Sequence, residues 1–113
     1  MKRSAASLQA EIERVKRQIV EVGDLRRGTL SLQHTVCGRS TCRCAANPPQ
    51  KHGPYYQLNY SMAGQSKTEA VHKENLLTVR RQVRNYAKLR KLVSRWMDLA
   101  TELAILRLKD SCK

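Results

Sequence analysis

Three cysteines crowd into one short segment and carry the clearest chemical signal in the sequence. The string CGRSTCRC places Cys37, Cys42 and Cys44 within eight residues, with four and then one residue between successive thiols. Thiolates are soft ligands that suit zinc, and a structural zinc ion takes four tetrahedral nitrogen or sulfur donors. The spacing therefore predicts a structural zinc site. Two other interpretations stay open, namely three reduced thiols in a loop or a redox-prone C-x-C pair.

A fourth ligand is needed to complete a tetrahedral site. His52 in the string KHGPY is the best placed donor, His34 is the next, and Cys112 could arrive only if the last helix folds nearby. Four protein ligands leave no open coordination position, so such a zinc ion would brace the loop and would not catalyse a reaction. Metal ligation by thiols indicates a reducing compartment, which predicts a cytoplasmic protein.

The charge balance points to a polyanionic partner. The 113 residues hold 22 Lys and Arg against 9 Asp and Glu, a formal charge of +13 that exceeds what solubility requires of a small domain. Between Glu74 and Asp98 lie seven cations and no acid. At about 100° per residue, six of the seven fall within an arc of about 100°, opposite an apolar stripe. These six predicted contacts to phosphate are Arg80, Arg81, Arg84, Lys88, Lys91 and Arg95.

Like charges four residues apart destabilise a helix slightly, which indicates that this row of cations has a use. The segment before the row repeats the bias, because no acid occurs from Leu25 through Thr68. Lysine and arginine contacts to phosphate release condensed counterions, so the predicted affinity falls with salt. The further candidates for such contacts are Arg39, Arg43, Lys51 and Lys67.

Hydrophobic periodicity predicts an α+β fold in one domain over residues 1–113. Apolar residues at steps of four and three from Leu8 to Val22 predict a first helix over residues 4 to 22, ended by a left-handed Gly23. Alternation predicts a strand from residue 28 to 36 and another over 55 to 61, and Ala63 with Gly64 predicts a turn into a third strand near 66 to 71. The three parts are residues 1–24, a sheet module with the cysteine loop over 28–71, and a long basic helix over 72–109.

The first helix is only about half as long as the last, so the two form a coiled-coil-like bundle with one end uncovered. The predicted apolar stripe of the long helix includes Val79, Leu89, Val93 and Trp96. A second copy of the chain is the simplest cover for the free end, and an unrelated protein is the other candidate. The residues predicted to form this interface are Trp96, Leu99, Leu103 and Leu106.

The chain also resembles a known family. CGRSTCRC, followed by HGPYYQLNYSMAGQSK and a long basic helix, is similar to short bacterial proteins of unassigned function that are often encoded beside transposases. The resemblance covers residues 26 to 105, and in it Cys37, Cys42, Cys44 and His52 match the cluster while Tyr55, Tyr56 and Gly64 match the hairpin. It implies a mobile-element context and a binding role, and it assigns no catalytic residue.

The sequence as a whole predicts a binding protein and no enzyme. It contains no paired-carboxylate, HExxH or serine-triad pattern, and no uncharged run approaches the roughly 20 residues that span a bilayer. We expect an accessory protein of a mobile element or recombination system that binds nucleic acid, with DNA favoured over RNA. It would act as a homodimer or as a subunit of a larger complex. The alternative is a coiled-coil adaptor that docks on a larger protein.

Overall fold

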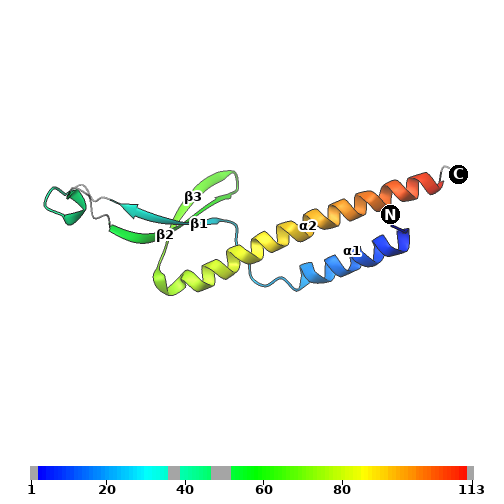
Figure 1. Ribbon diagram of the computed structural model, residues 1–113, viewed down its shortest axis with the longest axis horizontal. Coiled ribbons are helices and arrows are strands. Elements are labelled where there is room, and N and C mark those ends of the chain that lie inside the picture. The colour runs from blue at the N-terminus through cyan, green and yellow to red at the C-terminus, as the bar shows by residue number, and fades with distance from the viewer. Residues whose placement is uncertain (1–2, 36–38, 47–51, 112–113) are drawn as a thin grey trace. The chain divides into compact units, whose positions relative to one another are not determined.

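The computed structural model describes residues 3–35, 39–46 and 52–111, and in these ranges it confirms the predicted α+β class (Figure 1). The contacts within the chain form two compact units: a helical unit of residues 1–25 and 84–113, and a sheet unit of residues 26–83. The last helix runs through both, and each part of it is described with its own unit. In chain order the elements are α1 (Ala5–Val20), β1 (Thr29–Thr35), the 3-10 turn η1 (Arg43–Ala45), β2 (His52–Met62), β3 (Gln65–Val71), η2 (Lys73–Asn75) and α2 (Leu76–Ser111).

A side chain caps the start of α1, and another holds the segment that follows its end. Ser4 is the N-cap, and its hydroxyl accepts a hydrogen bond from the backbone N–H of Ser7 at 3.1 Å. The prediction of a left-handed Gly23 was wrong, because the helix ends at Val20 and its cap, Glu21, keeps right-handed geometry. Gly23 instead lies beside Asn85, whose amide nitrogen donates to the carbonyl of Asp24 at 2.8 Å. This hydrogen bond ties the exit of α1 to α2.

The core of the helical unit joins α1 to the carboxy-terminal half of α2 (Figure 1). Its buried residues are Leu8, Ile12, Val15, Leu99 and Leu103, with Leu92 and Leu106 packed against them. The sequence predicted a stripe through Leu89, Val93 and Trp96 instead. The leucines at 92, 99, 103 and 106 follow a second apolar row at steps of seven, four and three, and this is the row that α1 covers.

Most of the residues predicted to form a partner interface belong instead to the core of the helical unit. Leu99 and Leu103 are buried within the chain's own core, and Leu106 is partly buried against it, because α1 covers the end of α2 that was expected to be free. Trp96 is 37% exposed, and its ring lies 5.2 Å from the Lys16 ammonium. The more exposed apolar side chains in this part of α2 include Met97 at 58% and Ile105 at 51%.

The sheet is antiparallel in the order β1-β2-β3, and its three strands overlap the three that alternation and the Ala63–Gly64 turn predicted. Ala63 and Gly64 form the two-residue turn between β2 and β3, and both have positive φ, as a type I′ hairpin turn requires. β2 begins three residues earlier than predicted and includes Gly53 and Pro54. The register with β1 shifts opposite this point, between Gln33 and Thr35, which accommodates a proline that has no N–H to donate.

One face of the sheet is the inner face of its unit. Leu58 in β2 is fully buried, and its register partner Leu30 is partly buried on the same face. Gly28 has a φ of 150°, and a Cβ there would come within 2.6 Å of Leu58 Cδ1. Glycine is therefore required for the backbone to approach Leu58 this closely. The guanidinium of Arg80 lies 5.6 Å from the ring of Tyr56, which directs this face toward the first turns of α2.

Truncating the centre of the helical core should destabilise the protein. Leu8→Ala removes a fully buried side chain and leaves a cavity, so we expect a loss of about 2–5 kcal/mol in the free energy of unfolding. Leu77→Ala is the matched control, because Leu77 is 74% exposed and its truncation should cost less than about 0.5 kcal/mol. Chemical denaturation followed by Trp96 fluorescence measures both values. Equal losses would contradict the assigned core.

Candidate nucleic-acid interface

Three cations form an exposed row on α2 in the helical unit. Arg84, Lys88 and Lys91 follow one another at steps of four and three, which places neighbours about 5–6 Å apart on one side of the helix. All three are exposed, and none of them forms an ion pair with any residue that the structure describes. We call these three residues the basic row. They are the part of the predicted cationic surface that has no carboxylate partner within this unit.

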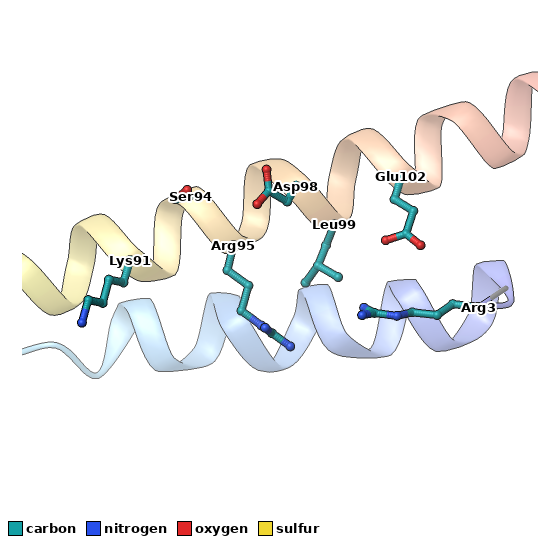
Figure 2. A pocket seen from close by; sticks show the side chains of 7 residues that line it. All are labelled: Arg3, Lys91, Ser94, Arg95, Asp98, Leu99 and Glu102. Atoms are coloured by element: carbon teal, nitrogen blue, oxygen red, sulfur yellow. The ribbon is translucent and has the colours of Figure 1, made fainter. Parts of the chain in front are cut away.

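Arg95 was predicted to belong to the same surface, and the structure assigns it a partner. Its Nη2 atom donates to Glu11 Oε2 at 3.2 Å, and Arg3 Nη1 donates to the same oxygen at 3.0 Å. A single carboxylate on α1 therefore holds two guanidinium groups. Figure 2 shows Arg95 extending from α2 across α1, with Arg3 approaching from the start of the chain.

The cations are not opposite the apolar seam of this unit, as the sequence predicted. Leu92 and Leu99 follow Lys88 and Arg95 by four residues, so they share the same side of α2, and the cations flank the α1 contact. A groove of about 400 Å³ runs along this border, and two acids in it offset its cations (Figure 2). Its lining residues are Arg3, Lys91, Ser94, Arg95, Asp98, Leu99 and Glu102.

The cations of the sheet unit that were predicted to contact phosphate differ in their surroundings. Arg80 stacks on Tyr56, while Arg81 is exposed and forms no ion pair within the described ranges. Lys67 is exposed on β3, opposite Tyr60 in the register. Arg39 and Arg43 are exposed before and within η1. Lys51 lies outside the described residues.

Much of the predicted zinc site also falls outside the described part of the chain. This applies to Cys37 and Cys112 and to the side chains of Cys44 and His52. Within the remainder, no three His, Cys, Asp or Glu side chains gather closely enough to hold a metal ion.

The described backbone of the cysteine loop is nevertheless informative. The N–H of Cys42 donates to the carbonyl of Arg39 at 3.1 Å, and the N–H of Ala45 donates to the carbonyl of Cys42 at 3.0 Å. These two consecutive turns fold the segment around Cys42 back on itself. The Cys42 residue is half-buried. At the nearby end of the sheet, the backbone of His52 pairs with Thr35, two residues before Cys37. The register thus brings the histidine of KHGPY to the strand that leads into the cluster.

Sequence reasoning missed Glu11, the carboxylate that pairs with Arg3 and Arg95. It lies next to Ile12 and therefore beside the apolar seam of α1. In paired helices, charged residues that flank the seam form interhelical ion pairs with the partner. An acid at this position, beside a helix rich in arginine, was the signal that could have identified it.

The fold and the site define a small α+β protein with a short sheet and a basic helix. The chain belongs to a family described as a domain of unknown function (DUF6788), whose model matches residues 5–81. The match includes α1, which lies outside the resemblance drawn from the cysteine motif, and it ends before the basic row. No curated protein and no solved structure matches the chain significantly. None of the described helices has the length and apolar content needed to cross a lipid bilayer.

Removing the shared carboxylate should weaken the helical unit. Glu11→Gln takes away the charge that accepts from Arg3 and Arg95, and we expect a loss of about 1 kcal/mol that shrinks at about 1 M salt. Glu13→Gln is the control, because that carboxylate is half exposed and, among the described residues, pairs with a single cation, Lys16, at 3.6 Å. Denaturation followed by Trp96 fluorescence compares the two. A control loss as large as that of Glu11→Gln would refute the bridging role.

Proposed function

We propose that this protein binds nucleic acid through its phosphate backbone, with DNA as the favoured substrate. One observation carries the proposal: the exposed basic row of Arg84, Lys88 and Lys91 has no carboxylate partner among the described residues. Each contact between one of these cations and a phosphate would release a condensed counterion, which supplies the binding free energy. The exposed cations Arg39, Arg43, Lys67 and Arg81 of the sheet unit would make further contacts of the same kind.

The preference for DNA has a separate basis. It follows from the resemblance to short proteins encoded beside transposases, which also supports an accessory role in a mobile element or recombination system. The phosphate contacts themselves do not discriminate between bases, because they fix position and not sequence.

Neutralising the basic row should weaken binding and flatten its dependence on salt. In a gel shift with duplex DNA from about 50 mM salt upward, the triple variant Arg84→Ala, Lys88→Ala, Lys91→Ala should reduce the slope of log K against log salt by about three. The reduction is about one for each phosphate contact removed.

The matched control removes the same charge from other positions of the same unit, in the triple variant Arg14→Ala, Arg17→Ala, Lys109→Ala. We expect this control to retain most of the affinity and slope of the unmodified protein. An equal loss in both variants would show that net charge alone matters. A duplex that stays unshifted at about 50 mM salt would reject nucleic-acid binding.

We also propose a structural zinc ion held by Cys37, Cys42 and Cys44, with His52, His34 or Cys112 as the fourth ligand. The proposal is supported by the thiol spacing, the two consecutive turns around Cys42 and the pairing of Thr35 with His52. A bound zinc ion would supply folding free energy by joining the cysteine loop to the end of the sheet. The arginines within the loop, Arg39 and Arg43, would then project from a braced segment.

Metal analysis tests this site directly. Protein purified under reducing conditions without chelators should hold about one zinc ion per chain, and Cys42→Ser should lower that content sharply. His52→Asn and His34→Asn compared side by side identify the histidine ligand, and Cys112→Ser tests the remaining donor. Zinc near zero in the unmodified protein would remove the proposal.

A second candidate function is that of an adaptor that docks on a larger protein. It is favoured by the exposed apolar side chains of Trp96, Met97 and Ile105 on α2. The gel shift separates the two functions, because an adaptor would leave the duplex unshifted.

A further inference from the structure

The sheet has a second face, opposite Leu58, that is polar and carries no charge. Because side chains alternate along a strand, this face collects every second residue of the three paired strands. Its members are Thr29, Ser31, Gln33, Tyr55, Gln57, Asn59, Ser61, Ser66, Thr68 and Ala70. We call this set the outer face. All ten side chains are exposed or half-buried, and none is charged in a chain whose charged residues make up 27% of the sequence.

Hydrogen bonds within the outer face leave its central amides available. Thr68 Oγ1 donates to Asn59 Oδ1 at 2.9 Å, which orients that amide and leaves its nitrogen without an acceptor among the described residues. Gln33 Nε2 donates to Ser31 Oγ at 3.4 Å, and that hydroxyl in turn donates to the backbone carbonyl of Gln57 at 3.4 Å. The side-chain amide of Gln57, in the middle of the central strand and half-buried, has no hydrogen-bond partner within the described ranges.

The two faces of the sheet also differ in whether a cation covers their tyrosine rings. Tyr60 and Tyr56, on the inner face, lie beneath the guanidinium groups of Arg26 and Arg80 at 5.2 and 5.6 Å. Tyr55 is the aromatic residue of the outer face, is 51% exposed, and has no cation over its ring in the described part of the chain. The outer face thus combines an open ring with the side-chain amide of Gln57 and the amide nitrogen of Asn59, neither of which has a hydrogen-bond partner among the described residues.

The surrounding charge identifies the kind of partner that fits. The sheet unit, residues 26–83, contains nine Lys and Arg against two acids, so a neutral hydrogen-bonding surface lies within a strongly cationic unit. The complementary ligand has phosphates outside and neutral donors and acceptors between them, which is the arrangement of a nucleic-acid groove. The major groove of B-form DNA is about 12 Å wide and admits a two-stranded β-ribbon, and three strands about 4.8 Å apart span about 10 Å. The major groove of A-form RNA is too deep and narrow for side chains to read.

We propose that the outer face of the sheet enters the major groove of duplex DNA and that the amides of Gln57 and Asn59 read base edges there. Asn and Gln side chains pair with the N6 and N7 atoms of adenine through two hydrogen bonds. The readout therefore favours adenine at the contacted positions. This inference rests on the proposed DNA binding and adds sequence discrimination to it.

Selection from random-sequence DNA duplexes by the full-length protein, followed by sequencing, tests the readout. The unmodified protein should enrich a motif that contains adenine, and Gln57→Ala with Asn59→Ala should lose that motif while still retarding bulk duplex. Affinity for the selected site should fall roughly tenfold or more, toward the affinity for unselected DNA. Gln18→Ala, on the exposed surface of α1, is the control and should enrich the same motif.

The outcomes separate this inference from the function on which it rests. Retarded duplex without any enriched motif, or an unchanged motif in the double variant, would overturn the readout and leave phosphate binding intact. Enrichment from a parallel library of duplex RNA in place of DNA would also overturn it. An unshifted duplex would remove both proposals together.

Discussion

Carboxylates are scarce in this chain, and their scarcity determines how its charges are arranged. Nine acids face 22 cations, and two of the acids, Glu11 and Glu69, pair with arginines from other segments of the chain. Glu11 holds Arg3 and Arg95 and fastens α1 to α2, while Glu69 on β3 holds Arg26 at 2.8 Å, just before β1. The Glu11–Arg95 and Glu69–Arg26 pairs join residues that are 84 and 43 positions apart in the sequence. The cations that no acid reaches, above all the basic row, are left to water or to an anionic polymer.

Aromatic rings, like carboxylates, hold cationic side chains in this protein. Four of the five aromatic residues have a cation over the ring, through the pairs Lys16–Trp96, Arg26–Tyr60, Arg80–Tyr56 and Arg90–Tyr86. A ring face attracts a cation without a counter-charge, and each contact contributes about 0.5–1 kcal/mol at exposed sites. The sheet is thereby divided into an inner face that engages arginine and an outer face of neutral amides, hydroxyls and one uncovered tyrosine.

The sequence predicted the elements well because each has a local signal. Apolar spacing placed α1 within two residues, and alternation with Ala63 and Gly64 located the hairpin. The second strand was predicted to begin at residue 55, but β2 begins at His52 and includes Pro54, because the shifted register of β1 accommodates the missing N–H of the proline. The helical seam was predicted on the wrong row of α2, since two apolar rows exist and only the position of α1 selects one. The pairing of Arg95 with Glu11 spans 84 residues, so helical spacing alone could not reveal it.

The rings beneath the arginines have a consequence for how the protein responds to its solvent. Ionic strength weakens attraction between exposed charges and phosphates strongly, but it affects buried leucines and stacked rings much less. Leu8, Leu58 and the tyrosines of the inner face would therefore keep their contacts at salt concentrations that release the proposed nucleic-acid partner. The proposed binding and release of nucleic acid would therefore be reversible without unfolding of the protein.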